Sequence, residues 1–436
     1  MVTSTSGHRL HPAWIVAGVA FVALIGAAGF RSAPGVLMVP LQDEFGWSRG
    51  VLSLAVGVNL VLFGLTAPFA AALIERFGLR AVTSLALVLV AAGSGLSVLV
   101  TASWQLVLLW GVVIGLGTGS IALVLAATVA NNWFVRRRGL VMGVLTAANA
   151  TGQLVFLPVL ARMAERSGWR AASLVVAAAA LAVVPLVLRH LRDDPAERGV
   201  APYGAAEAAG PGPTGGRSAR GGPGPARRAV RALADAARIR TFWALTVGFA
   251  ICGATTNGLI GTHFIPSAHD HGMPQTTAAG LLAVVGVFDI VGTIVSGALT
   301  DRVSPRLLLA VYYSLRGVGL LMLPDLLAGS VHPSIIAFVI VYGLDWVATV
   351  PPTAALCREA FASAGTVVFG WVFAAHQIGA ALASVGAGVI RDVTGDYTIA
   401  WFGAALLCVV AAIASIGVRK GPGRAPQPGR TTAAVP

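Results

Sequence analysis

The chain has 436 residues, of which 56% are hydrophobic and only 11% carry a charge. Soluble domains usually contain about 25% charged residues, so this composition excludes a soluble enzyme, a disordered chain and a disulfide-stapled scaffold. The net charge of +13 would suit a nucleic-acid-binding protein or a membrane protein whose basic residues gather in its inner loops. The mean hydropathy of +0.82 favours the membrane protein, and we expect no nucleic-acid partner.

Twelve apolar runs follow one another along the chain, and each can cross a bilayer as a helix of about 20 residues. They lie at approximately 13–33, 50–73, 79–100, 104–130, 139–161, 169–188, 241–264, 278–300, 306–326, 334–357, 366–390 and 398–418. The first run follows a polar segment and is expected to be a helix rather than a cleaved signal. Because backbone groups in lipid must bond within their own segment, the sequence predicts an all-α integral membrane protein with twelve transmembrane helices.

The gap between the sixth and seventh runs has a different composition. Residues 189–240 contain ten arginines and two Gly/Pro-rich stretches, at 210–213 and 221–225. Such a composition cannot bury a core, so we expect a flexible basic linker. The expected division is an N-terminal six-helix half, the linker, a C-terminal six-helix half and a tail, at 1–188, 189–240, 241–418 and 419–436.

The distribution of basic residues indicates the orientation. If the N-terminus lies inside, the inner segments hold 23 of the lysines and arginines and the outer loops hold five. Cytoplasmic loops carry such an excess. We therefore expect a multi-pass protein of the cell membrane with both termini, the linker and the tail in the cytoplasm.

The two halves repeat each other. Residues 71–80 align with 297–306 at an offset of 226 residues. At an offset of 227 residues, Gly152 and Gly168 fall on Gly379 and Gly395. Matches at a nearly constant offset indicate a duplicated six-helix unit, and parallel repeats with a site near the membrane midplane are typical of transporters.

An acidic residue followed by arginine ends the second run as Glu75-Arg76 and the eighth as Asp301-Arg302, and Gly297 precedes the second copy. At these residues the chain resembles the major facilitator superfamily, whose loop signature they match. The resemblance covers all twelve helices. It implies alternating access between the two halves, with this loop motif taking part in gating.

Within that superfamily the chain most resembles the monocarboxylate-transporter branch and its bacterial oxalate/formate-antiporter relatives. Residues 41–49 (LQDEFGWSR) and 132–140 (NWFVRRRGL) carry this resemblance. The branch has a basic residue late in its first helix, near the place of Arg31, and an aspartate in its eighth helix, which Asp289 matches. Four residues later the branch has an arginine that grips the substrate carboxylate, and this chain has Thr293 instead.

Four neighbouring helices of the second half place an ionisable residue near their middle. These residues are Asp289, Arg316, Asp345 and His376. A charge inside the bilayer is costly, so we expect a structural network in which Arg316 is neutralised by Asp345 or Asp289. One carboxylate is then left to bind the coupling proton, and Asp289 is the candidate. His376 titrates near neutrality and is the second candidate; a hydrogen-bonded core histidine is the alternative.

Polar side chains in the apolar runs are candidates for binding the solute. They are Arg31, Asn149, Gln153, Asn257, Thr293 and Gln377. Asn149 and Gln153 are four residues apart and share a helix face, and hydrogen bonding between helices is the alternative for both. Arg31 lies about 26 Å along its helix; it either extends to the outer surface or points into the cavity mouth, where it would attract an anion.

Two other patterns indicate packing or bending. The glycines of 115–119 (GLGTG) lie inside an apolar run with no strand before them, which favours close helix packing over a dinucleotide loop. Pro351 and Pro352 should kink the tenth helix beyond Asp345. The three cysteines lack the spacing of metal ligands, so we expect neither a metal nor a cofactor.

The sequence therefore predicts a secondary active transporter that moves a small organic solute, expected to be a carboxylate-type anion, by proton-coupled alternating access. The alternative is a proton-linked exporter or facilitator of a neutral amphipathic compound, which Thr293 would allow. A transporter-like sensor is less compatible, because the linker is too poor in apolar residues for a signalling domain. We expect no enzyme, because no nucleophile constellation is present, and we expect a monomer.

Overall fold

A computed structural model describes residues 11–205, 224–327 and 330–418. The expected tail, 419–436, lies outside the described residues. Within them, eleven helices are long and apolar enough to cross a membrane. One of these, α6 (Arg138–His190), has 53 residues and holds both the fifth and the sixth expected crossing, which a non-helical Gly168 separates. The all-α membrane fold is confirmed.

The first half begins with three long helices and ends with the bent α6. Its helices are α1 (Pro12–Phe45), α2 (Arg49–Phe77), α3 (Leu79–Leu96), α4 (Ser103–Leu106), α5 (Ile114–Trp133) and α6, and a π-helical segment, η2 (Val107–Val113), joins α4 to α5. Local sequence sets some of these ends. The Ser48 hydroxyl accepts a hydrogen bond from the Val51 amide at the start of α2, and Gly46 ends α1 with a φ of 66°.

The second half contains two interrupted crossings. Its helices are α8 (Arg240–Gly253), α9 (Gly261–Asp270), α10 (Gln275–Thr300), α11 (Pro305–Leu326), α12 (Pro333–Asp345), α13 (Val350–Phe361), α14 (Gly365–Thr394) and α15 (Thr398–Gly417). The seventh crossing is α8 and α9 joined by the π-helical η5 (Ala254–Ile260). The tenth is α12 and α13 joined by a turn at 346–349. Pro351 and Pro352 lie in the first turn of α13, where their missing N–H groups cost little.

The internal repeat is visible in the packing. Gly168 and Gly395 end the fifth and eleventh crossings with φ values of 83° and 86°. Gly152 lies against Ala28 of α1, and Gly379 lies against Ala250 of α8. Each glycine of the second pair therefore meets the first helix of its own half.

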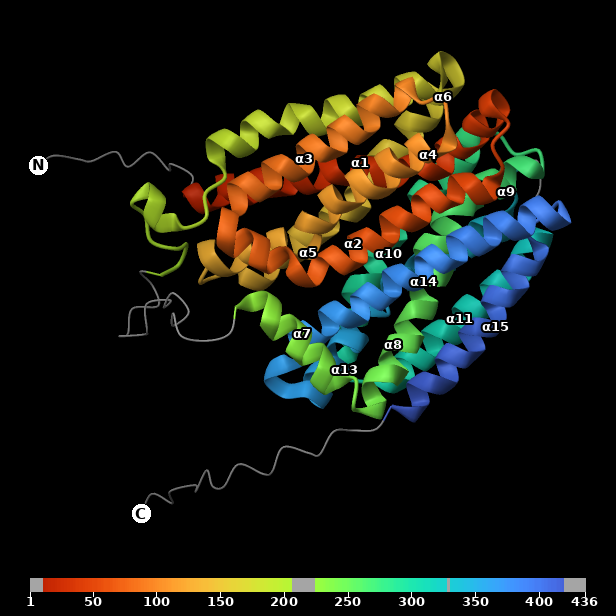
Figure 1. The fold of residues 1–436 in the computed structure, drawn as a ribbon. Coiled ribbons are helices and arrows are strands. Elements are labelled where there is room, and N and C mark those ends of the chain that lie inside the picture. Colours follow the sequence, from red (N-terminus) through yellow and green to blue (C-terminus); the bar gives the residue numbers. More distant parts are fainter. Residues whose placement is uncertain (1–10, 206–223, 328–329, 419–436) are drawn as a thin grey trace, which may run out of the picture.

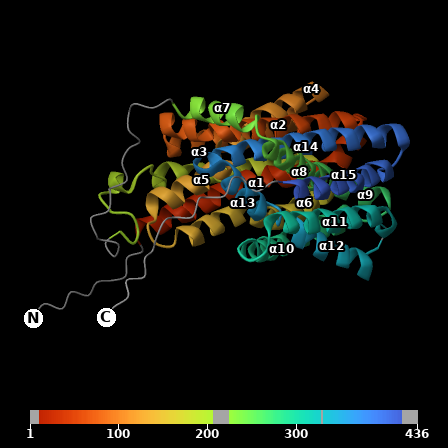
Figure 2. The same ribbon diagram turned by 90° about the horizontal axis from the view of Figure 1, so that it is seen from below.

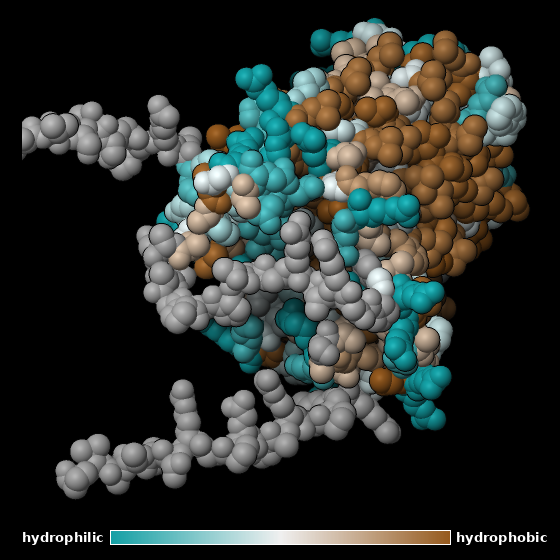
Figure 3. Space-filling view, turned by 60° about the vertical axis from the view of Figure 1, so that its left-hand side comes forward, coloured by the Kyte–Doolittle hydropathy of each residue, from teal (hydrophilic) through white to brown (hydrophobic). Residues whose placement is uncertain are grey.

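The two halves lie side by side, the first in red to yellow and the second in green to blue (Figure 1). Three pairs of helices join them: α2 with α14, α6 with α10, and α1 with α9. The start of α1 and the end of α15 lie at the same side of the molecule, which we call the terminal face; the other side is the opposite face (Figure 1). Apolar residues cover much of the outer flank, and hydrophilic residues gather toward the terminal face (Figure 3).

The segment expected to be a flexible linker differs from that expectation in its described parts. Tyr203 pairs with Phe134 and packs on Trp14 of α1. Residues 225–236 form a helix, α7 (Pro225–Ala236), which lies against the terminal-face ends of α2 and α14 (Figure 2). The overall composition conceals this helix, because three of its alanines and its leucine gather on one face, at 229, 232, 233 and 236.

Candidate functional site

A pocket lies between the two halves. Its lining comes from α1, α2 and α6 of the first half and from η5, α9, α10 and the turn after α12 of the second. The space between these side chains amounts to about 600 Å³, including the part that is open to solvent. On the opposite-face side, α1 and α9 nearly touch: a Cβ placed on Gly35 would lie 3.2 Å from the Gly261 carbonyl oxygen.

Three of the residues predicted to bind solute line this pocket. Arg31 comes from α1, Gln153 from α6 and Asn257 from η5. The guanidinium of Arg31 lies 4.5 Å from the centre of the Phe63 ring. Both halves thus supply polar groups to one space, as an alternating-access site requires.

The pocket also holds polar residues that sequence reasoning did not select. Ser32, Asn59 and Thr262 line it, and the Asn59 amide donates to the Trp110 carbonyl at 2.7 Å. The signal for Asn59 was an uncharged polar residue in an apolar run, which is equally typical of helix packing. Apolar side chains complete the wall: Phe30, Val56, Leu60, Leu157, Leu282 and Trp346.

The other predicted solute-binding residues lie elsewhere. The Thr293 hydroxyl donates to Asp289 at 3.1 Å. Gln377 is buried between α14 and α2 beside Gly64, and neither of its amide atoms has a hydrogen-bond partner among the described residues. The backbone of Asn149 lies one turn before Gln153 on α6, and its side chain is outside what the structure describes.

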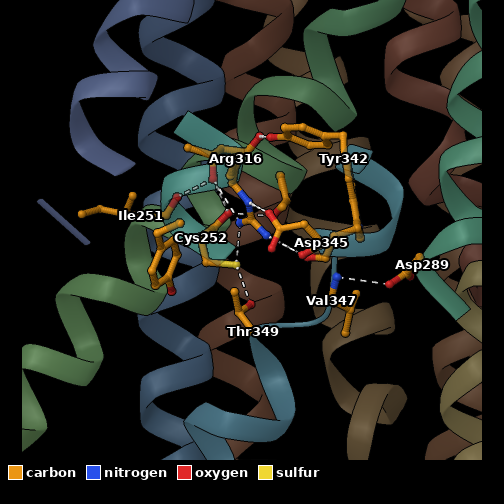
Figure 4. Close-up of polar contacts among 12 residues, drawn as sticks. Ile251, Cys252, Asp289, Arg316, Tyr342, Asp345, Val347 and Thr349 are labelled. Atoms are coloured by element: carbon orange, nitrogen blue, oxygen red, sulfur yellow. Dashed lines mark hydrogen bonds and ion pairs between the residues drawn. The ribbon is translucent and has the colours of Figure 1, made fainter. Parts of the chain in front are cut away.

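The break in the tenth crossing is held by charged side chains. Its turn leaves backbone groups without helical partners, and such groups cannot remain unsatisfied inside a membrane. Arg316 donates from Nη2 to the carbonyls of Asp345 (2.7 Å) and Trp346 (3.3 Å). Arg316 Nε also lies 2.6 Å from Asp345 Oδ2. The structure therefore brings together the pair predicted to neutralise each other (Figure 4).

Asp289 approaches the same break from α10. Its Oδ1 accepts hydrogen bonds from the Val347 amide and the Thr293 hydroxyl, both at 3.1 Å. Figure 4 shows Asp289 on the side of Val347 away from Arg316. Asp289 is 7% exposed, and no salt bridge to it is present among the described residues. It is thus a buried carboxyl group held by neutral donors.

His376 lies beside the pocket rather than in its wall. Its Nε2 is 3.5 Å from the Asn257 amide nitrogen, so it contacts a residue that does line the pocket. The rings of Phe373 and His376 stack at 5.8 Å. This setting suits either a proton-accepting side chain or a packed core histidine.

The two copies of the loop motif lie at the terminal face, away from the pocket. Glu75 pairs with Arg228 of α7 at 3.8 Å, and the Arg76 guanidinium lies 5.2 Å from the Phe77 ring centre. Asp301 and Arg302 are exposed at the end of α10. Gly297 has no neighbour that a Cβ would meet within 4 Å.

Sequence reasoning missed a polar cluster between the halves at the opposite face. Arg49 of α2 is 4% exposed and donates to both carboxylate oxygens of Asp270, at 2.6 and 2.8 Å. Asp392 of α14 accepts from the Arg49 and Gly50 amides at 3.0 and 2.8 Å. Arg49 ends the 41–49 segment that carries the family resemblance, but nothing in the sequence indicated its contacts with Asp270 and Asp392, because these residues lie near the ends of helices, where charges are common. The cluster closes the opposite face.

The chain matches a known protein family and several known proteins in sequence. Residues 19–384 match the Major Facilitator Superfamily. The uncharacterized MFS-type transporter YcxA of Bacillus subtilis is 25% identical over 405 residues, which cover 88% of this chain and 90% of that protein. Monocarboxylate transporter 13 of Bos taurus is 27% identical and monocarboxylate transporter 11 of Homo sapiens is 27% identical; each match covers 88% of this chain, with 84% and 78% of the relative.

Two solved structures share the fold at 15% sequence identity. One is a bacterial homologue of the human lysosomal transporter Spinster in an inward-facing, unoccupied conformation, with a TM-score of 0.70 over 96% of this chain and 100% of that one. The other is a D-xylose-proton symporter, with a TM-score of 0.70 over 92% and 97%. At this identity the likeness concerns the fold alone.

Proposed function

This chain belongs to the Major Facilitator Superfamily of secondary transporters, and we propose that its solute is a small carboxylate anion that is carried together with a proton. The observation that supports this most is the guanidinium of Arg31 in the wall of the pocket between the halves. An arginine binds a carboxylate through charge-assisted hydrogen bonds. Several relatives are named monocarboxylate transporters, which agrees with this chemistry.

The rest of the pocket suits the body of such a solute. Gln153 and Asn257 offer amide donors and acceptors from opposite halves, and apolar side chains supply the remaining wall. A carboxylate with a short, partly apolar body would use both kinds of surface. Thr293 replaces the arginine that the branch carries at its place, so in this chain the positive charge for the anion comes from α1.

The proton is proposed to bind Asp289. In its ionised form the carboxylate accepts from Val347 at the break of the tenth crossing and from Thr293. Protonation removes the charge and weakens both hydrogen bonds, so the turn at 346–349 loses one of its attachments to α10. The second half can then repack as the pocket changes the face to which it opens. His376 is the second proposed carrier, through its contact with Asn257.

The membrane topology is part of the same proposal. The chain is a multi-pass membrane protein, and the excess of arginine on the terminal face supports a cytoplasmic position for that face and for both termini, in the cell membrane. A monomer is sufficient for transport, because the two halves of one chain complete the pocket.

Proton-linked carboxylate transport is tested by reconstituting the protein in vesicles that enclose a pH-sensitive dye. Adding short-chain monocarboxylates outside should acidify the lumen faster than in protein-free vesicles. This should occur without an uncoupler, because an anion that is carried together with a proton moves no net charge. Hydroxylated and aromatic monocarboxylates extend the panel. If counterflow is found only with neutral amphipathic compounds and no carboxylate moves protons, the exporter or facilitator alternative holds, and Thr293 would be its supporting feature.

A further inference from the structure

The polar cluster at the opposite face contains a histidine that the proposed transport cycle does not use. His263 of α9 is completely buried. Its Nδ1 lies 3.1 Å from the Tyr397 hydroxyl, and its Nε2 lies 2.8 Å from the Ser384 carbonyl oxygen. The Ser53 hydroxyl of the other half lies 3.4 Å from Nε2. His263 is therefore packed at the boundary between the two halves.

The hydrogen bonds define the protonation state of this histidine. A carbonyl oxygen can only accept, so Nε2 must carry the hydrogen that it donates to Ser384. The Tyr397 hydroxyl accepts from Arg49 Nη1 at 2.8 Å. Burial raises the pKa of Tyr397 to about 12, so the hydroxyl keeps its proton. Among the described residues, Nδ1 is the one acceptor in hydrogen-bond contact with that hydroxyl, which therefore donates to Nδ1. A ring that accepts at Nδ1 and donates at Nε2 is neutral.

The charged groups around His263 do not favour an imidazolium in this arrangement. Arg49 on α2 is the cation that shares Tyr397 with it. The carboxylate of Asp270 is already bound by Arg49 and, at 2.8 Å, by Arg391 of α14. Asp392 of α14 is bound by the first two amides of α2. Each nearby carboxylate is thus engaged within the cluster.

We propose that His263 is a second proton-binding site of this transporter, empty while the opposite face is closed and filled from that face when the cluster opens. Protonation at Nδ1 removes the acceptor of the Tyr397 hydrogen bond and places a second cation beside Arg49. The protonated ring is therefore incompatible with the closed cluster. A proton bound there keeps α2 and α9 apart, and so holds the opposite face open.

The sign of the pH dependence follows from linkage. The closed state binds no proton at His263, and the open state exposes the ring to water, where a histidine has a pKa of about 6.5. Above that pH the closed state is fully favoured by its hydrogen bonds. Below it, the ratio of open to closed molecules rises by at most about tenfold per pH unit, because one proton is taken up.

The test is a distance between the halves measured at several pH values. Spin labels are attached to cysteines that replace Ser167, beside the bend of α6 at Gly168, and Ser330, shortly after the end of α11; both positions are exposed. The native cysteines are buried, and protein without the added cysteines gives the background. Between pH 8 and pH 5 the population with the longer distance should increase, with the steepness expected for the uptake of one proton. Because Asp289 also titrates in the proposed cycle, this comparison is made with Asp289→Asn in both proteins: the distances should respond to pH when His263 is present and should not in His263→Gln, whose amide can still donate and accept.

Matched variants separate this site from other titrating groups. His269→Gln changes an exposed histidine on the same helix and should respond as the native protein does. Asp289→Asn should also keep the response, so a failure of the proposed proton carrier would not be confused with a failure here. Tyr397→Phe removes the donor to Nδ1 and should move the midpoint to higher pH. A native protein that ignores pH, a His263→Gln protein that responds normally, or an unchanged midpoint in Tyr397→Phe would overturn the proposal.

Discussion

Arg316 and Asp345 face each other across the break of the tenth crossing, with Nε of the arginine 2.6 Å from Oδ2 of the aspartate. The same guanidinium donates to the carbonyl of Asp345 and to that of Trp346. The arginine therefore neutralises a buried acid and also completes the hydrogen bonding of an interrupted helix. Its two roles can be separated by mutation.

Arg316→Ala and Asp345→Ala should each destabilise the protein by about 3–5 kcal/mol, because each leaves a buried partner charge. The double variant should recover only part of this loss, since the carbonyls of Asp345 and Trp346 remain unpaired. Thermal unfolding in detergent measures all three. The exchange Arg316→Asp with Asp345→Arg should recover less than the double alanine variant, because an aspartate at 316 cannot donate to carbonyls. If the double variant loses as much as the sum of the single ones, the two residues do not act as a pair.

Gly292 allows α10 to approach α12 closely. A Cβ at this position would lie 1.9 Å from the Leu344 carbonyl oxygen, whereas a Cβ on Gly280 of the same helix would meet nothing within 4 Å. Gly292→Ala should therefore destabilise the protein by about 1–3 kcal/mol. Gly280→Ala should stabilise it slightly, by about 0.5–1 kcal/mol, because alanine is the better helix residue. Equal thermal midpoints for the two variants would show that the helices separate without cost.

Arg31 should control affinity for the anion. Arg31→Ala should weaken carboxylate binding by about 10- to 100-fold, as expected for losing a hydrogen-bonded charge worth about 1.5–3 kcal/mol. Arg31→Lys should lie between this variant and the native protein. Half-saturation in counterflow gives the affinity, and Arg80→Ala, at an exposed arginine of α3, is the control. Unchanged affinity in Arg31→Ala would place the anion elsewhere.

The helix α7 should matter more than the chain before it. Trp371 of α14 donates to the Ala229 carbonyl at 2.9 Å, and Ala229 is 3% exposed. Ala229→Glu should cost about 1–3 kcal/mol by burying a charge against α2 and α14, while Ala234→Glu on the exposed face should be neutral. Replacing residues 206–223 with a glycine–serine stretch of equal length should leave transport intact, because their composition carries no core. A large loss of transport in well-inserted protein would give that stretch a specific role.

The sequence was sufficient for the fold because its signals are long-range and redundant. Each crossing is a run of apolar residues. Gly168 and Gly395, which the sequence offset relates to each other, both have a positive φ in the structure. The helix at 225–236 was missed because a window dominated by Gly, Pro and Arg hides one apolar face. Local composition cannot report which surface a short helix will meet.

The candidate site was only partly predictable. A charge in an apolar run is a strong signal, so Arg316 and Asp345 could be identified, although not their contacts with backbone carbonyls at the helix break. Asn59 and Thr262 carry no charge, and their place in the pocket depends on the rotation of each helix. The cluster of Arg49, Asp270 and His263 joins segments more than 200 residues apart, and only the assembled fold brings them together.

The most direct test of the account compares Asp289→Asn with the native protein in proteoliposomes, because asparagine keeps the shape of the carboxyl group and cannot release a proton. An imposed pH gradient should drive accumulation of the carboxylate by the native protein and by the control Asp325→Asn, which changes an exposed aspartate near the end of α11. Asp289→Asn should fail to accumulate solute yet retain counterflow in the same vesicles, since exchange of solute for solute needs no net proton release. If Asp289→Asn still concentrates solute in response to the gradient, Asp289 is not the proton carrier and the central claim is wrong.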